Sequence, residues 1–142
     1  MRDARDANPA FDGKTITLFN LYEGAATVIT RGDAAVKLLQ QLGFVPNPRI
    51  DAMRSFQGRV EVGPERFELL DTDVVLGTTP AGDASEELKD SPTFQRLGAV
   101  RRGAFVDLDI VTATSIAFPS ALSVQWAVAE IVPKLADAAA AR

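Results

Sequence analysis

The chain has 142 residues, of which 46% are hydrophobic and 24% charged, with a formal net charge of −4. This length suits one domain with a single hydrophobic core. Cysteine and histidine are absent, which excludes thiol nucleophiles, structural zinc sites and acid–base catalysis by histidine. The arginines and lysines form no basic patch, so a nucleic-acid partner is not expected.

Membrane and export signals are missing from the sequence. No apolar run approaches the roughly 20 residues that span a bilayer. The polar and charged stretch 1–8 does not resemble a signal peptide, so an exported protein with this sequence would have lost its targeting segment.

The first part of the chain predicts a short helix, two strands and an amphipathic helix. Arg2–Ala7 is expected to be helical and to stop at Asn8-Pro9. The β-branched and apolar stretch Thr15–Leu21 predicts a buried strand, and the weaker Ala25–Thr30 predicts a second extended segment. Apolar residues that recur with the helical period predict a helix over Asp33–Leu42.

The middle of the chain predicts a helix followed by a buried strand, and then a second strand. In Gly63-Pro64-Glu65, proline suits a first helical turn and the acid meets the positive end of the helix dipole. Asp73–Gly77 is a continuous apolar run, typical of parallel sheets. Gly98 is expected to end a helix, with a basic turn at Arg101-Arg102-Gly103 before a strand over Ala104–Asp107.

Loops and one long helix are predicted elsewhere. Prolines and a glycine within residues 46–58 indicate a loop-rich stretch, and a second loop is expected over residues 107–119. The last helix is predicted over Ser120–Ala138, where Pro133 should kink or shorten it. Trp126, in the middle of this helix, is expected in the core.

Strands alternate with helices along the whole chain. This pattern predicts an α/β fold, a three-layer domain with a mainly parallel sheet. Ligands of such sheets approach the carboxyl ends of the strands. The segments expected at that edge are Tyr22–Gly24, which should leave its strand as a loop, Thr78–Gly82 and Leu108–Phe118.

Catalytic motifs are absent. No glycine-rich nucleotide motif is present, and the serines have neither a histidine nor a nucleophile elbow. Carboxylates near strand ends, Asp71, Asp73, Asp107 and Asp109, could hold Mg²⁺ in an α/β enzyme. Helix capping and a solvated sheet edge explain the same residues more simply.

Five side chains outside these groups are candidates for ligand contact. Arg31 lies between an extended segment and a helix, where it could hold an anion over the ligand edge or remain solvated. Tyr22 could stack on a ligand or close the core. Phe56, Gln57 and Phe118 are expected in loops, where aromatic residues either bind or cap the core.

Four stretches of the sequence, in their order and spacing, resemble the C-terminal lobe of class III periplasmic-type substrate-binding proteins of ABC importers for iron–siderophores. The stretches are Asn8–Ile16, Asp33–Phe44, Glu65–Leu76 and Leu97–Leu108. Proteins of this family have two α/β lobes joined by a long helix, with the ligand in the cleft. The resemblance implies that residues 1–9 are a remnant of the interlobe helix and that residues 10–142 are the C-terminal lobe.

The resemblance also implies a function without catalysis: capture of an anionic ferric siderophore and its delivery to a membrane permease. It implies that ligand-holding groups correspond to Tyr22, Arg31, Phe56, Gln57 and Thr78. It implies that Glu65 takes the place of an acid that docks onto arginines of the permease. Since the siderophore itself ligates the iron, no metal ligand and no cofactor are expected from this chain.

The expected partners are a ferric siderophore or related chelate, the ABC permease and the missing N-terminal lobe. The expected location is extracytoplasmic, in the periplasm or cell envelope, with a lipid anchor on the full-length protein. Haem or a corrinoid is an alternative ligand, and Tyr22 is the one residue that could be an anionic haem ligand. A magnesium-dependent α/β enzyme and a pure interaction module are the other classes that stay open.

Overall fold

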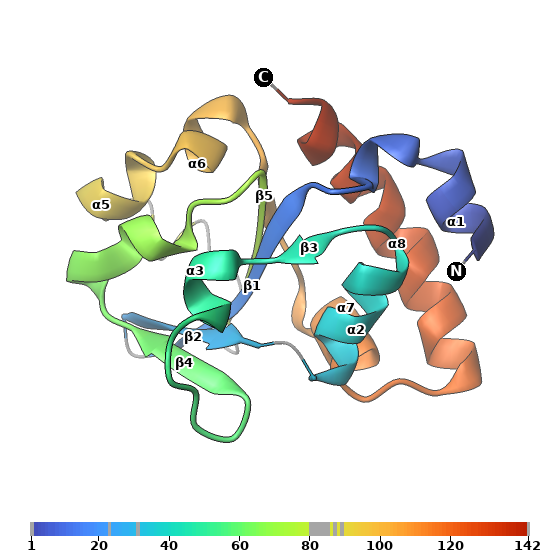
Figure 1. Ribbon diagram of the computed structural model, residues 1–142, viewed down its shortest axis with the longest axis horizontal. Coiled ribbons are helices and arrows are strands. Elements are labelled where there is room, and N and C mark those ends of the chain that lie inside the picture. Colours follow the sequence, from blue (N-terminus) through green and yellow to red (C-terminus); the bar gives the residue numbers. More distant parts are fainter. Residues whose placement is uncertain are drawn as a thin grey trace.

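A six-stranded sheet forms the middle layer of the structure, a computed structural model that describes residues 2–22, 24–30, 32–79, 86, 88 and 90–141 (Figure 1). Its strands are β1 (Thr15–Tyr22), β2 (Ala25–Ile29), β3 (Val45–Pro46), β4 (Arg59–Val62), β5 (Val74–Thr78) and β6 (Phe105–Asp107). The strand order is β4-β2-β1-β5-β6, and β3 pairs with the first residues of β1.

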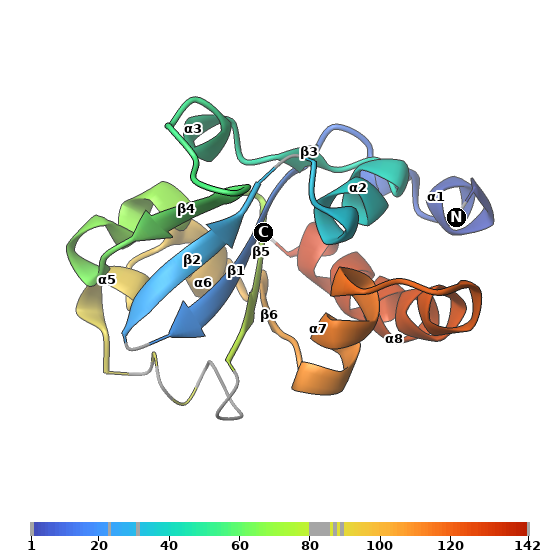
Figure 2. The same ribbon diagram turned by 90° about the horizontal axis from the view of Figure 1, so that it is seen from below.

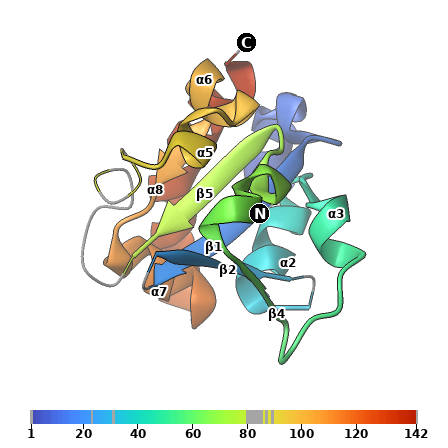
Figure 3. The ribbon, with the colours of Figure 1, turned by 90° about the vertical axis from the view of Figure 1, so that its left-hand side faces the viewer.

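Helices cover the sheet from both sides, as the sequence predicted for a three-layer fold (Figure 2). The 3-10 helix η2 (Pro64–Leu70), α5 (Pro92–Gln95) and α6 (Gly98–Arg102) form one layer, and α2 (Ala34–Gln41), α7 (Ile110–Ala117) and α8 (Ala121–Ala140) form the other. Both α6 and α8 contact β5 (Figure 3). The short elements α1 (Arg2–Ala7), η1 (Pro9–Phe11) and α3 (Pro48–Asp51) complete the described helices.

The sheet is mixed. The pairs β1–β3, β1–β5 and β5–β6 are parallel, whereas β1–β2 and β2–β4 are antiparallel. The antiparallel part follows from chain length, because β2 begins at Ala25, three residues after Tyr22 ends β1. A connection this short makes a hairpin, since a parallel neighbour needs a crossover of a dozen or more residues.

The structure around Gly98 differs from the sequence prediction at two points. This glycine begins α6 rather than ending a helix. The Asp71 carboxylate explains the difference, because it accepts hydrogen bonds from the N–H groups of Gly98 and Ala99 at 3.1 and 3.0 Å and so caps α6. The basic pair predicted in a turn forms the last turn of this helix, which ends at Gly103 with φ of 79°.

Three further segments contain more helix than their sequence predicted. The loop expected over residues 107–119 contains α7, which Asp109 caps by accepting the Thr112 N–H at 2.8 Å. The loop-rich stretch 46–58 holds α3, whose first N–H groups donate to the Asn47 side chain. Finally, α8 continues through Pro133 to Ala140, so this proline does not shorten the helix.

Aromatic rings fill the space between the sheet and the η2–α5 layer. The ring of Phe19 lies 6.3 Å from that of Phe94 and 6.2 Å from that of Phe105, and Phe94 also contacts Phe67. Gly77 of β5 lies against the same rings, because a Cβ at this position would be 2.6 Å from Cζ of Phe19. The core therefore uses a glycine to let two phenylalanines approach the sheet backbone.

Candidate functional site

Four polar side chains lie in one line across neighbouring strands of the sheet, and we call them the polar row. Asn20 of β1 pairs with Thr78 of β5 on one side and with Thr27 of β2 on the other, and Thr27 pairs with Glu61 of β4. Paired residues direct their side chains to the same face of a sheet. Exposure rises along the row, from buried Thr78 through half-buried Asn20 and Thr27 to exposed Glu61. The row therefore leads from solvent into the interior.

At its buried end, the polar row borders a hollow of ≈ 50 Å³. Strands β1, β2 and β5, the beginning of α2 and one side of α7 form its walls, and Arg59 of β4 reaches it from the edge. On α7 the lining includes Ala113 and Ala117, which lie one turn apart on the same side of the helix. Their small side chains leave room between α7 and the sheet.

Thr78 is the deepest member of the polar row. Only 3% of its surface is exposed, and its Oγ1 has no hydrogen-bond partner among the residues that the structure describes. Burying a hydroxyl without a partner costs about 1–3 kcal/mol, and native proteins contain few such groups. The Oγ1 of Thr78 thus lies at the wall of the hollow and is available for a hydrogen bond.

An ion pair stands at the rim of the hollow. Nη1 of Arg59 lies 3.0 Å from Oδ2 of Asp33, and the other carboxylate oxygen of Asp33 accepts the Ala35 N–H at 2.9 Å as the cap of α2. Since the two side chains are 40% and 21% exposed, the pair itself contributes about 0–1 kcal/mol. Its geometric effect is to tie β4 to the first turn of α2.

The structure brings Tyr22 and Thr78, both predicted as ligand contacts, to the same edge of the sheet. Tyr22 is the last residue of β1 rather than part of a loop, and it lies two positions beyond Asn20 on the same face. Its side chain is 63% exposed, so it does not close the core. Arg31, and residues 80–82 of the loop expected after β5, lie outside the described residues.

Phe56 and Gln57 lie at the other end of the sheet. Phe56 exchanges two backbone hydrogen bonds with Arg59, at 2.8 and 2.9 Å, and this closes a tight turn around Gln57, which has φ of 51°. The turn leads into β4 beside Ile29, at the end of β2. Because β2 runs antiparallel to β1, this end is remote from Tyr22. Phe56 is 77% exposed and does not cap the core.

No sequence pattern identified Asn20, Thr27, Arg59 or Glu61 as site residues. One signal was present: Asn20 is the one amide within the apolar run of β1, and strand interiors disfavour asparagine. The other three could not be recognised, because their positions depend on which strands become neighbours.

Glu65 is exposed in the first turn of η2. Its carboxylate folds back over the backbone of Gly63, where a Cβ would lie 2.6 Å from Oε1. The helix follows directly after Val62, which pairs with Ala26 near the end of β1 that carries Tyr22. The predicted docking residue thus lies toward the same end of the sheet as Tyr22, beside the edge strand β4.

The acidic residues near strand ends have structural partners. Asp71 caps α6, and Asp73 accepts the Thr15 N–H at 2.9 Å. Asp109 caps α7, and the hydrogen bond from the Thr112 backbone, more than any other cause, lowers the pKa of its carboxyl. Within the described part of the chain, no three or more acidic, histidine or cysteine residues group in a way that could hold a metal ion. The magnesium alternative therefore gains no support.

Large apolar side chains are exposed on α7, α8 and the turn between them, and we call them the α7–α8 surface. Its members are Ile110, Val111, Phe118, Leu122 and Trp126. The prediction that Trp126 lies in the core is wrong, since 44% of its surface is exposed. The core side of α8 is instead taken by Ala127, Ile131 and Leu135. Next to this surface, a groove of ≈ 650 Å³ separates the start of α8 from α1.

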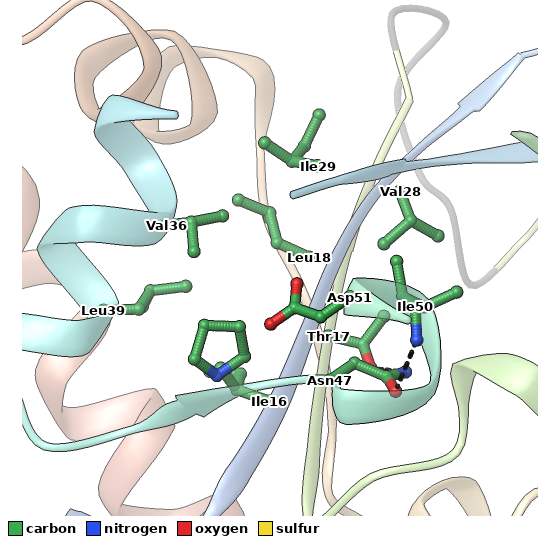
Figure 4. Close-up of a pocket in the computed structure, with 11 residues that line it drawn as sticks. Ile16, Thr17, Leu18, Val28, Ile29, Val36, Leu39, Asn47, Ile50 and Asp51 are labelled. Atoms are coloured by element: carbon green, nitrogen blue, oxygen red, sulfur yellow. Dashed lines mark hydrogen bonds between the residues drawn. The ribbon is translucent and has the colours of Figure 1, made fainter. Parts of the chain in front are cut away.

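A second enclosed space lies between β1, α2 and α3 (Figure 4). Its volume is only ≈ 10 Å³, about the room for one water molecule. Asn47 donates to Oγ1 of Thr17 at 3.0 Å and to the Leu69 carbonyl at 2.7 Å beside this space. These bonds fasten α3 to β1 and η2, so this space is part of the framework rather than a ligand site.

Among the described helices, none is both long and apolar enough to cross a membrane. No family model matches the chain, and no curated protein matches it. Solved structures do match. One is PiaA from Streptococcus pneumoniae in complex with ferrichrome, 21% identical with a TM-score of 0.78, over 99% of this chain and 50% of that one.

Two other matches are similar. A periplasmic solute-binding protein from Mycobacterium smegmatis is 22% identical with a TM-score of 0.78, over 97% of this chain and 46% of that one. FhuD2 from Staphylococcus aureus with bound ferrioxamine B is 19% identical with a TM-score of 0.71, over 96% of this chain and 53% of that one. The chain has the FhuD-like fold of one lobe of a class III binding protein. It spans about half the length of these structures, and the resemblance predicted from its sequence is confirmed for the fold.

Proposed function

We propose that this chain is the siderophore-binding lobe of an ABC importer, which captures a ferric siderophore and delivers it to a membrane permease. The observation that carries this proposal is the match over nearly the whole chain to a lobe of PiaA, whose structure holds ferrichrome. The polar row supports it, because it lies near the carboxyl ends of β1 and β5, where α/β sheets receive their ligands.

The binding surface that we propose begins at the exposed ring of Tyr22 and follows the polar row inward to Thr78. An aromatic ring offers a broad apolar contact, while the amide of Asn20 and the guanidinium of Arg59 offer hydrogen bonds. Arg31 adds a second cation for an anionic chelate. Phe56 and Gln57 stay predictions, which require a ligand that extends to the turn before β4.

We propose that residues 10–142 are the C-terminal lobe and that residues 1–9 end the helix between the lobes. The matched structures are about twice as long as this chain. A missing N-terminal lobe would account for the α7–α8 surface, because a second lobe packed there would cover these exposed apolar side chains. The whole protein would act outside the cytoplasm, held at the cell envelope by a lipid anchor, and Glu65 would contact the permease.

Equilibrium dialysis tests the binding role directly. The chain is dialysed against ferrichrome and ferrioxamine B loaded with radioactive iron, and retained iron is counted. We expect the chain to retain the radioactive complex, and we expect an excess of the same unlabelled ferric complex to displace it. If neither complex nor any other ferric chelate in a panel is retained, the proposal is overturned.

Haem is the second candidate, and the exposure of Tyr22 favours it, because a phenolate at a sheet edge could reach a haem iron. A haem titration compares the chain with its Tyr22→Phe variant. A Soret shift that appears only with Tyr22 would move the ligand from siderophore to haem. An identical shift in both proteins removes Tyr22 as the haem ligand, and the absence of a shift in both removes the haem candidate.

A further inference from the structure

Several hydrogen-bond donors line the hollow beside Thr78. Among the described residues that line it, Asp33 carries the one carboxylate, and both of its oxygens accept hydrogen bonds, one from Ala35 and one from Arg59. Toward the described residues Arg59 donates through Nη1, to Asp33 and to the Gly58 carbonyl, and a guanidinium has further N–H groups and no acceptor. The hydroxyl of Thr78 and the amide of Asn20 also line the hollow, and both can donate.

We propose that this hollow is a subsite for one small oxygen-acceptor group of the ligand, a carbonyl or a carboxylate. The group accepts the O–H of Thr78, which has no hydrogen-bond partner among the described residues, and the N–H of Asn20, with Arg59 at the rim. This inference rests on the proposed function and names the chemistry that the site selects.

The size of the hollow fits such a group. One water molecule needs roughly 10–15 Å³ of comparable space, and the hollow has ≈ 50 Å³. It therefore admits a terminal polar group and not a whole chelate, whose body would remain over the polar row and Tyr22. Ala113 and Ala117 keep this space open, so a larger side chain at either position closes it.

The charges at the rim set the selectivity. Among the described residues that line the hollow, a cationic amine meets the positive charge of Arg59, and the carboxylate of Asp33 is already paired with that charge. An acceptor oxygen instead completes the hydrogen bonding of a buried hydroxyl, which makes binding more favourable than at an exposed serine or threonine.

Thr78→Val is the decisive change, because valine keeps the shape of threonine and removes its hydroxyl. The variant removes the desolvation penalty of this buried hydroxyl, so we expect it to raise Tm. It also removes the hydrogen bond to the ligand, so we expect it to weaken binding of ferrichrome or ferrioxamine B roughly 5-fold. Thr78→Ser restores a hydroxyl and should recover most of the affinity. Thr114→Val, the same change at an exposed position of α7, is the matched control and should alter neither quantity.

Binding is measured by the same dialysis for the parent chain, these three variants and Ala117→Leu, with Tm from circular dichroism. Ala117→Leu, which fills the hollow, should weaken binding in parallel with Thr78→Val. If the parent chain binds and Thr78→Val binds equally well, the hydroxyl holds water only and the subsite is overturned alone. If the parent chain binds neither probe nor any other ferric chelate of the panel, the proposed function itself has failed.

Discussion

Asp33 and Arg59 connect two elements that are remote in sequence: Oδ2 of Asp33 lies 3.0 Å from Nη1 of Arg59, while Oδ1 of Asp33 caps α2. One carboxylate thus orders both the edge strand β4 and the helix whose start lines the hollow. The two functions of this side chain can be separated by mutation.

Asp33→Ala removes both the cap and the ion pair, whereas Arg59→Met removes only the pair. We expect the first variant to lose about 1–2 kcal/mol of unfolding free energy and the second less than about 1 kcal/mol. Urea denaturation at neutral pH measures both losses. Equal losses in the two variants would show that the cap contributes nothing beyond the pair.

Asp109 predicts a specific pH dependence. The Thr112 backbone N–H, the foremost cause, lowers the pKa of this carboxyl in the folded state. The pKa of this carboxyl is therefore lower in the folded state than in the unfolded state, where it is near 3.9. The resulting stabilisation is fully present at pH values above the unfolded-state pKa, and it is lost as the pH falls through the folded-state pKa. Asp109→Asn keeps a capping side chain but cannot titrate. Relative to this variant, the parent chain should lose stability below about pH 4. A difference between the two that stays constant down to pH 2.5 in urea titrations contradicts the assignment.

Gly77 should tolerate no side chain. An alanine Cβ at this position would lie 2.6 Å from Cζ of Phe19 and 2.9 Å from Cε2 of Phe105. Gly77→Ala should therefore cost about 1–3 kcal/mol through overpacking. In a double-mutant cycle, Phe105→Leu should recover part of this loss, because the smaller side chain gives room. Additive losses would mean that the strain lies elsewhere.

The α7–α8 surface should tolerate a charge in the isolated chain. Leu122 is 81% exposed, so Leu122→Lys is expected to change stability by no more than about 0.5 kcal/mol. Ile131→Ala, on the buried side of the same helix, should cost about 2–5 kcal/mol. In the two-lobed protein that we propose, Leu122→Lys should lower Tm, and an unchanged Tm there would remove this surface from the lobe contact.

Glu65 should matter for transport and not for ligand affinity. It is exposed beside β4, away from the residues that line the hollow. In the full-length protein, Glu65→Ala should leave siderophore binding intact and reduce uptake into cells. Glu68→Ala, at another exposed acid of η2, is the control. Normal uptake with Glu65→Ala would end the docking role.

Local signals explain which elements the sequence could predict. Strand β1 and helix α2 were predicted because each has its own local pattern, an apolar β-branched run for β1 and an amphipathic repeat for α2. Helix α7 was missed because its run of isoleucine, valine, threonine and alanine has no clear polar face. The start of α6 at Gly98 depends on the Asp71 carboxylate, 27 residues earlier in the chain, which no local pattern contains.

The candidate site was predicted only in part, for the same reason. Thr78 and Tyr22 end strands, and strand ends can be recognised locally. Thr27 and Glu61 join them only because β2 turns back beside β1 and β4 follows it. Phe56 and Gln57 were expected with Tyr22, but the antiparallel direction of β2 carries them to the other end of the sheet.

The polar row combines positions 20, 27, 61 and 78, so it has no counterpart in any single stretch of the unfolded chain. A ligand that needs the whole row binds the native state alone, and by mass action it raises the melting temperature further as its own concentration increases. The melting temperature of the chain therefore reports whether the site is occupied. A thermal-shift screen of unlabelled chelates would find the cognate compound without a radioactive label, an absorbance signal or a transport assay.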